Sequence, residues 1–216
     1  MIAIAEANPG RRALSKERRR QQLINATIKG ISKKGLGSLT LADVANEAGL
    51  SQGIVNLHFN SKDNLLNETL RFLAEDYDAQ FMKTLEKSSR GAAETLLALM
   101  EMDLKPAVCD RKKLAVWFAF WGEVQTVPTY QEICAAYNAK YIDIMRELCE
   151  QIVAEGNYSD IHPQTVTDAL SSLTDGLWLS CLINPKSFDR VAALRSVTSY
   201  LSAVFPDHYN HQEDPA

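Results

Sequence analysis

The chain has 216 residues, of which 46% are hydrophobic and 23% charged, so it is long and apolar enough to bury a sizeable core. No apolar run reaches the roughly 18 to 20 residues of a membrane span, and Glu6 stands where a signal peptide is basic. These features exclude a chain that is disordered throughout and predict a cytoplasmic protein.

Charge is segregated along the chain, although the overall net charge is only −4. Residues 1–62 contain ten basic and four acidic side chains, a net charge of +6, which leaves −10 for the remainder. A basic head on an acidic body indicates that the head meets a polyanion that the body repels. A solvated basic tail is the alternative, because six of these ten basic residues lie within residues 11–20.

The reactive side chains predict neither a metal ion nor a cofactor, and no catalytic residue. The four cysteines (Cys109, Cys134, Cys149 and Cys181) form no C-x-x-C pair and are expected to be reduced thiols in the core. The four histidines form no H-E-x-x-H motif, and His208 and His211 lie in a polar tail that we expect to be disordered. The sequence contains no glycine-rich phosphate loop, and we find no carboxylate with a paired base, so we do not expect an enzyme.

Apolar residues recur at spacings of three and four almost throughout, which predicts an all-α protein. A flexible basic tail (1–15) is expected to precede a three-helix head (16–62), whose first helix covers 16–34, and a helical body (63–206) to precede a flexible tail (207–216). Pro106 and Pro128 mark boundaries between body helices. The body helices are predicted over 62–87, 92–102, 111–126, 129–154, 163–183 and 189–205.

The middle of the head predicts two short helices joined by a tight turn. Thr40 and Asp43 have the spacing of a capping box at the start of a helix. Gly49 supplies a left-handed turn, and Ser51 is positioned to cap the next helix. Val55 and Phe59 lie four residues apart, so they are expected to anchor this second helix to the core of the head.

The remaining positions of the second helix are expected to face the major groove of DNA. Gln52 can reach base edges, and Gly53 allows close approach of the backbone. Thr40, Ser51 and Lys62 are interpreted as phosphate contacts, which fix register without reading sequence. Arg18 and Arg19 belong either to an arm that enters the minor groove or to a solvated tail. The predicted DNA-binding residues are Arg18, Arg19, Thr40, Ser51, Gln52, Gly53, Asn56, Leu57, His58 and Lys62.

These motifs resemble those of the TetR family of repressors. The resemblance is carried by LADVANEAGLSQGIV at 41–55 and HFNSKDNLL at 58–66, and it is dense over about residues 18–70. It implies a helix-turn-helix head that binds double-stranded operator DNA. One position departs from the pattern, because Asn56 stands where the family commonly has tyrosine. Aromatic packing on the sugar-phosphate backbone is then in doubt at that position, and adenine recognition by Asn56 is the alternative.

The body contains aromatic residues at helical spacing. Trp117 and Trp121 lie one turn apart, and Tyr137 and Tyr141 repeat the spacing on the following helix. Trp178 adds a third indole, so aromatic side chains from several helices are expected to converge. Aromatic residues at such spacing also form ordinary core, and this interpretation is as good as a binding site for Trp117 and Trp121. For Trp178, a place in the core or in an interface is the better interpretation.

Two of these segments, WFAFW at 117–121 and DGLWL at 175–179, are similar to stretches in the BetI-type, choline-responsive branch of the TetR family. The resemblance implies a quaternary ammonium effector, which aromatic faces and a carboxylate would hold. Asp103, Glu123 and Asp175 are candidate counter-charges, and spacing does not select among them. The predicted effector-binding residues are Trp117, Trp121, Tyr137, Tyr141, Trp178 and Asp175.

The helix predicted over 163–183 mixes small and large residues around Trp178, as expected where two copies of a helix cross closely, and the helix over 189–205 completes a hairpin with it. They resemble the four-helix dimer interface of the family, and a homodimer reads an inverted repeat with two recognition helices. The predicted interface residues are Leu173, Leu177, Ser180, Val197 and Leu201.

The sequence therefore predicts a homodimeric transcriptional repressor that a small molecule releases from its operator. The helix that begins at Lys62 touches both head and body, so it is expected to transmit the effector signal. A ligand-responsive activator of the same family is the main alternative. A non-specific architectural DNA-binding protein is a second alternative, but an aromatic cavity in an acidic body would have no function in such a protein.

Overall fold

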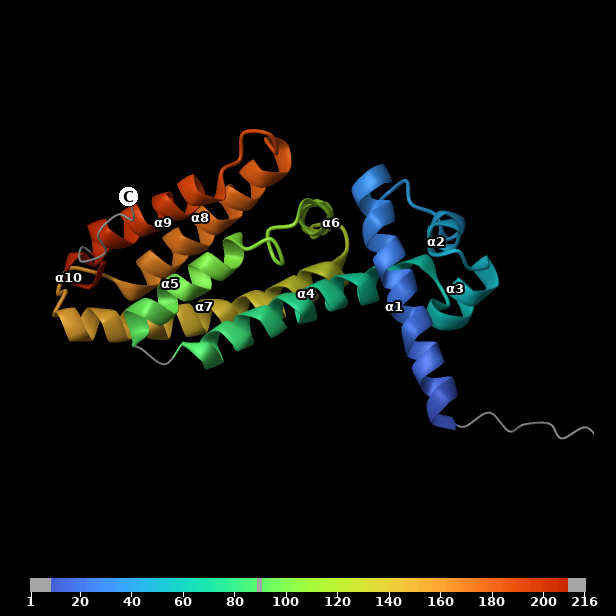
Figure 1. Ribbon diagram of the computed structural model, residues 1–216, viewed down its shortest axis with the longest axis horizontal. Coiled ribbons are helices and arrows are strands. Elements are labelled where there is room, and N and C mark those ends of the chain that lie inside the picture. The colour runs from blue at the N-terminus through green and yellow to red at the C-terminus, as the bar shows by residue number, and fades with distance from the viewer. Residues whose placement is uncertain (1–8, 89–90, 210–216) are drawn as a thin grey trace, which may run out of the picture.

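The computed structural model describes residues 9–88 and 91–209, which form ten α-helices and no strand (Figure 1). The all-α prediction is therefore confirmed for this part of the chain. The helices are α1 (Pro9–Lys34), α2 (Leu41–Ala48), α3 (Gln52–Phe59), α4 (Lys62–Lys87), α5 (Ala92–Leu104), α6 (Arg111–Trp121), α7 (Pro128–Gly156), α8 (Pro163–Ile183), α9 (Arg190–Val204) and α10 (Pro206–Tyr209).

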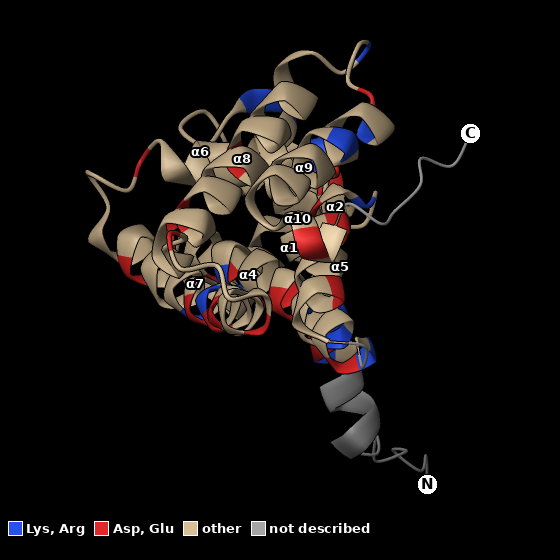
Figure 2. Ribbon diagram, turned by 90° about the vertical axis from the view of Figure 1, so that its left-hand side faces the viewer, with Lys and Arg blue, Asp and Glu red and all other residues tan. Residues whose placement is uncertain are grey.

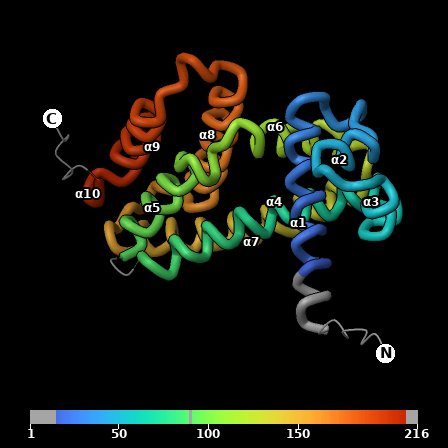
Figure 3. Tube along the Cα trace, turned by 45° about the vertical axis from the view of Figure 1, so that its right-hand side comes forward, coloured from blue at the N-terminus to red at the C-terminus, as the bar shows by residue number. Residues whose placement is uncertain are grey.

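Helices α1 to α3 form a small head at one end of an elongated molecule (Figures 1 and 3). α4 leaves the head and runs along the body beside α7, and α8 and α9 form a hairpin on the other side of α5. α7 packs against both α5 and α8, so it is the central helix of the body.

Two apolar clusters stabilise the fold, and their boundary does not coincide with the predicted domain boundary at residue 62. The first cluster joins α4, α5, α7, α8 and α9. The second contains the head residues Leu23, Val55 and Phe59, and it also contains Val116 and Phe120 of α6. Because α6 packs directly against α1, the head is attached to the body through α6 as well as through α4.

Both ends of the described chain are more ordered than the sequence predicted. α1 begins at Pro9, so the prediction of a flexible tail was wrong for residues 9–15; proline suits the first turn of a helix because its missing N–H has no partner there. Residues 1–8 lie outside the described residues. α6 is shorter than predicted, because it ends at Trp121 and residues 122–126, which were predicted to be helical, form a turn.

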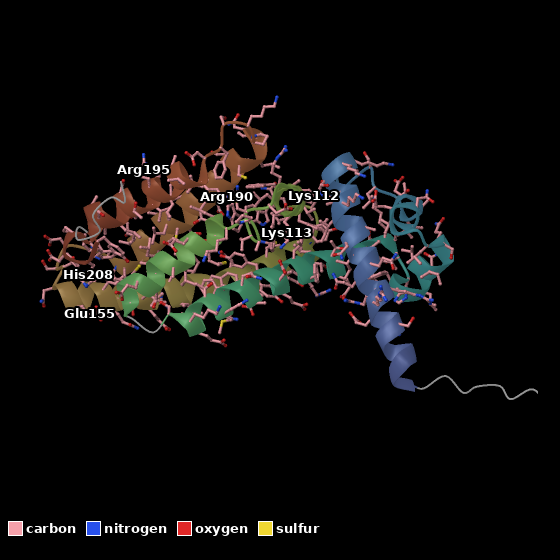
Figure 4. The ribbon with its side chains drawn as sticks, in the orientation of Figure 1. Lys112, Lys113, Glu155, Arg190, Arg195 and His208 are labelled. Carbon is pink, nitrogen blue, oxygen red and sulfur yellow. The ribbon has the colours of Figure 1, made fainter. Side chains whose placement is uncertain are left out.

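The prediction of a flexible C-terminal tail was wrong for residues 207–209. Tyr209 is buried, and its hydroxyl donates to the Ala93 carbonyl oxygen at 2.7 Å. His208 Nδ1 lies 3.0 Å from the hydroxyl oxygen of Tyr158, and its Nε2 lies 3.6 Å from a carboxylate oxygen of Glu155, at the end of the body away from the head (Figure 4). Ring contacts of His208 with Tyr158 and of Tyr209 with Phe205 also hold this segment. His211 lies outside the described residues.

Three of the four cysteines are buried free thiols, as predicted, whereas Cys134 is only half-buried and lines a cavity. Within residues 9–88 and 91–209, no helix combines the length and the apolar character that crossing a membrane requires.

Replacing Tyr209 by phenylalanine tests whether the C-terminal turn is part of the body. Loss of the hydrogen bond to Ala93 is expected to lower the free energy of unfolding by about 1 kcal/mol in urea denaturation. Tyr200→Phe is the matched control, because the Tyr200 hydroxyl has no hydrogen bond to any residue that the structure describes. Equal stability of Tyr209→Phe and wild type would contradict a structural role for residues 206–209.

Candidate functional site

The helix-turn-helix forms through local backbone interactions. Thr40 accepts a hydrogen bond from the Asp43 amide while the Asp43 side chain accepts one from the Thr40 amide, so the predicted capping box is confirmed. Gly49 has φ 64°, the left-handed conformation that lets α2 end and the chain turn. Ser51 is the N-cap residue of α3, but its side chain makes no capping hydrogen bond, which corrects that detail of the prediction.

The outer face of α3 is exposed and polar with one apolar exception. Val55 and Phe59 are buried in the head and fix the orientation of the helix, as predicted. Gln52, Gly53 and Asn56 are exposed on the opposite side, and Leu57 is 72% exposed. The predicted base-reading residues therefore share one accessible surface of the head.

Several basic residues of the head form ion pairs with acidic side chains. Lys29 and Lys33 both pair with Glu47, and Arg20 pairs with Glu68. The Lys62 ammonium donates to the Gly37 carbonyl oxygen at 3.2 Å, so this predicted phosphate contact also ties the start of α4 to the turn before α2.

Other basic residues of α1 have no acidic partner in the part of the chain that the structure describes, and some of them lie near α3. Arg18 and Arg19 are exposed and form no ion pair with any described residue. Partial burial, together with the nearby Lys16 and Arg19 cations, lowers the pKa of His58 and so disfavours its charged form. Lys16 and Arg19, which form no ion pair with any described residue, thus place positive charge near His58 of α3.

A cavity of about 420 Å³ lies in the body between α4, α5, α6, α7 and α8. All six predicted effector-binding residues line it, namely Trp117, Trp121, Tyr137, Tyr141, Trp178 and Asp175. The i, i+4 spacing on α6 and on α7 thus identified two walls of one cavity. Tyr77 of α4 lines it too, and it was missed because its place in a long apolar stripe made it look like ordinary core.

The aromatic rings stand at steep angles to one another and surround the space from several sides. The Tyr77 ring meets the Tyr141 ring edge-on at a centroid distance of 4.8 Å and the Trp178 ring at 5.9 Å. Trp117 and Trp121 lie 6.1 Å apart on α6. Trp178 is buried in the body and is fixed by a 2.8 Å hydrogen bond from its indole N–H to the Asp103 carbonyl oxygen.

Asp103 is a buried carboxyl group in the cavity wall. It accepts a hydrogen bond from the Tyr77 hydroxyl at 2.8 Å and one from the Thr174 hydroxyl at 3.5 Å. Burial raises the pKa of Asp103 to about 7, the nearby Asp175 carboxyl also raises it, and the two hydrogen bonds oppose this shift. Asp103 is therefore partly protonated near neutral pH.

The cavity has a negative electrostatic character. Asp103 and Asp175 are the only charged residues among the described residues that line it, and no lysine, arginine or histidine does so. Asp175 lies at the solvent-exposed rim, and partial burial raises the pKa of its carboxyl group. Glu123, the third candidate counter-charge, is exposed and does not line the cavity.

The predicted dimer-interface residues divide into two groups. Val197 and Leu201 are fully buried in the core of this one chain, so their assignment to an interface was wrong. The apolar period of α9 was identified correctly, but the body itself covers it. Leu173, Leu177 and Ser180 are half-buried. The large apolar residues that α8 and α9 do expose are Leu179 (42%), Ile183 (62%) and Val191 (66%).

The exposed α3, which follows α2 across a tight turn and has free basic residues nearby, defines a helix-turn-helix DNA-binding head, and it is joined to a helical body that contains a cavity. Residues 23–69 match the family described as "Bacterial regulatory proteins, tetR family", and residues 92–206 match "BetI-type transcriptional repressor, C-terminal". The chain belongs to the TetR family of transcriptional regulators, and its C-terminal domain is of the BetI type.

Relatives and solved structures agree with this assignment. The HTH-type transcriptional regulator BetI of Paraburkholderia phytofirmans is 30% identical over 193 residues, which cover 88% of this chain and 94% of the relative. The protein of the same name from Burkholderia thailandensis is 29% identical over 190 residues, with the same coverage of 88% and 94%.

Two crystal structures share the fold. A protein from Pseudomonas aeruginosa PAO1 superimposes with a TM-score of 0.78 at 24% identity, over 91% of this chain and 95% of its own. A protein from Saccharomonospora viridis in complex with choline superimposes with a TM-score of 0.73 at 20% identity, over 86% of this chain and 96% of its own.

The raised pKa of Asp103 predicts that this residue makes the folded protein less stable as the pH rises. Between about pH 4 and 7 the folded chain keeps the proton that the unfolded chain has lost, so the Asp103 contribution to the free energy of unfolding falls across that range. Asp103→Asn cannot lose this proton. Its unfolding free energy relative to wild type is expected to rise by more than about 1 kcal/mol from pH 5 to pH 8.

Urea denaturation at several pH values measures this difference. Asp168→Asn, which removes an exposed carboxylate on α8, is the control for loss of a negative charge alone. A constant difference between Asp103→Asn and wild type across the range would show that Asp103 keeps an ordinary pKa in the folded protein.

Proposed function

We propose that this protein is a transcriptional repressor that binds an inverted-repeat operator as a homodimer and is released by a cationic small molecule, choline or a related quaternary ammonium. A cationic effector is supported by the cavity of about 420 Å³, whose lining is rich in aromatic residues and contains acidic but no basic side chains. The head supplies operator binding, and the body supplies the ligand response.

A quaternary ammonium fits this cavity for a physical reason. Its methylated nitrogen has no N–H to donate, so the protein must hold it by other means than a hydrogen bond to the cation. The rings of Trp117, Trp121 and Tyr137 line the cavity and can offer the negative side of an aromatic quadrupole, and Asp103 and Asp175 offer opposite charge. An anionic ligand would meet two carboxyl groups and no cation, which disfavours it.

The comparisons support choline as the first effector to examine. The Saccharomonospora viridis protein that shares this fold is a complex with choline, and the relatives at about 30% identity carry the name BetI. The similarity of residues 92–206 to the BetI-type domain covers the whole cavity except its α4 wall.

The packing of α6 offers a route by which an occupied cavity can affect the head. Trp117 and Trp121 line the cavity, whereas Val116 and Phe120 of the same helix are buried in the apolar cluster of the head. A cation that draws α6 toward the acidic side of the cavity would therefore move a contact surface of α1. Release requires that the ligand bind the DNA-incompetent arrangement more tightly than the competent one.

The α8–α9 hairpin is the proposed dimer interface. Its outer surface carries the exposed side chains of Leu179, Ile183 and Val191, with Gly176 and small polar residues between them. The two helices together carry only four charged residues, namely Asp168, Asp175, Arg190 and Arg195. Acidic residues gather instead around α4 and α7 (Figure 2). An apolar surface that is poor in charge suits contact with a second copy of the chain.

Operator binding with and without choline tests the proposed function. The purified chain is titrated onto DNA from upstream of its own gene and onto random DNA, at one stated salt concentration, with choline or with its neutral carbon analogue 3,3-dimethylbutan-1-ol. Choline is expected to weaken specific binding about 5- to 150-fold, and the neutral analogue much less, because only choline carries the charge. Specific binding that choline leaves unchanged would reject the effector, and no preference over random DNA would reject the repressor.

Ile183→Asp tests the proposed interface, because it places a charge in the middle of an apolar contact. Wild type is expected to sediment as a dimer at micromolar concentration and Ile183→Asp as a monomer in analytical ultracentrifugation. Leu57→Asp is the matched control, since it also charges an exposed apolar side chain, on α3 of the head, and should remain dimeric. A monomeric wild type, or a dimeric Ile183→Asp, would overturn the assignment.

A further inference from the structure

Gly53 has no structural reason within this chain to be glycine. It lies in the first turn of α3 and is absent from the glycines with positive φ. A methyl group added at its Cα would meet only the Ser51 hydroxyl oxygen, at an ordinary contact distance of 3.8 Å. Glycine in a helix is unfavourable relative to alanine. The space beside Gly53 is therefore open to a molecule outside the chain.

Leu57 lies one helical turn after Gly53, on the same face of α3. Its side chain is 72% exposed, the largest exposed fraction among the four exposed large apolar residues of the described chain. The other three lie on α8 and around the start of α9, so Leu57 is the only one in the head. Burial of Val55 and Phe59 holds α3 in an orientation that prevents Leu57 from turning inward.

We propose that Leu57 is a specificity-determining residue that reads a thymine by contacting its 5-methyl group in the major groove, with Gly53 providing the clearance for that approach. This inference rests on the DNA-binding role of the head. It does not depend on the effector or on the sign of regulation.

The chemistry of the groove selects the partner. Among the four bases only thymine presents a methyl group in the major groove, where an apolar side chain can bury it. Gln52 and Asn56, which flank this face of α3, are exposed amides suited to base-edge hydrogen bonds. The cations of Lys16 and Arg19, which form no ion pair with any described residue and lie near His58, suit the phosphate backbone. An apolar side chain surrounded by these groups fits DNA better than it fits the apolar surface of another protein.

Removal of one methyl group from the DNA and one side chain from the protein tests the contact directly. The full chain first selects its operator from random duplexes, and each thymine is then replaced by deoxyuridine, which lacks only the methyl group. At one thymine in each half-site, removal of the methyl group is expected to lower the affinity of the wild-type protein for the operator about three- to tenfold. Leu57→Ala should bind the unmodified operator more weakly and show no further loss at that thymine, whereas Leu57→Met should keep the loss.

The outcomes separate the inference from the function beneath it. If every deoxyuridine substitution weakens wild type and Leu57→Ala by the same factor, or if no substitution has an effect, Leu57 does not read a methyl group. If wild type selects no sequence at all, the sequence-specific role of the head fails instead.

Gly53→Ala provides an independent measurement. The variant is expected to keep or raise the midpoint of thermal unfolding, because the added methyl group has room in the folded chain and favours helix. Operator affinity should nevertheless fall at least about tenfold, because the same methyl group fills the space that the base pair needs. Unchanged affinity would show that the space at Gly53 has no role in DNA recognition.

Discussion

The structure depends on the double role of α6. Neighbouring positions of this short helix point about 100° apart, so two pairs of residues with the same four-residue spacing serve two surfaces. Val116 and Phe120 are fully buried with the head residues, and Trp117 and Trp121 line the cavity. One helix therefore forms both a wall of the cavity and a contact surface for the head. The sequence predicted transmission through α4, and the packing of α6 adds a second connection.

The electrostatics of the molecule follow the same division. The head concentrates positive charge beside α3, although Glu47, Asp43 and Glu68 neutralise several of its cations. The cavity concentrates carboxyl groups that are costly to bury, and Asp103 escapes part of that cost by taking up a proton. A bound cation would lower the pKa of Asp103 and reduce this cost, which ties the proposed ligand to a polar group that otherwise destabilises the fold.

Local sequence predicted the features that local interactions determine. The capping box at Thr40, the left-handed Gly49 and the buried face of α3 depend on residues within a few positions of one another. The cavity walls were found because i, i+4 spacing places two rings on one face whatever the helix packs against.

Tertiary packing decided what the sequence left open. Periodicity identified Val197 and Leu201 as apolar, but it does not reveal whether the same chain or a second copy covers them. Tyr77 of α4 and Asp103 of α5 are joined by a hydrogen bond between residues 26 positions apart, and no sequence motif predicts that contact. Helix α10 is held by ring contacts of His208 with Tyr158, which follows α7, and of Tyr209 with Phe205, which follows α9. Its polar composition had suggested disorder, because the sequence does not reveal these contacts.

The central claim is that the cavity and the DNA-binding head are energetically coupled. Coupling is reciprocal, so operator DNA must weaken choline binding by the same factor by which choline weakens operator binding. Isothermal titration of choline into the free protein and into the protein saturated with operator, at one salt concentration, measures that factor directly. The account predicts choline binding that is about 5- to 150-fold weaker on the operator complex. Equal affinity for the free and the DNA-bound protein would contradict it.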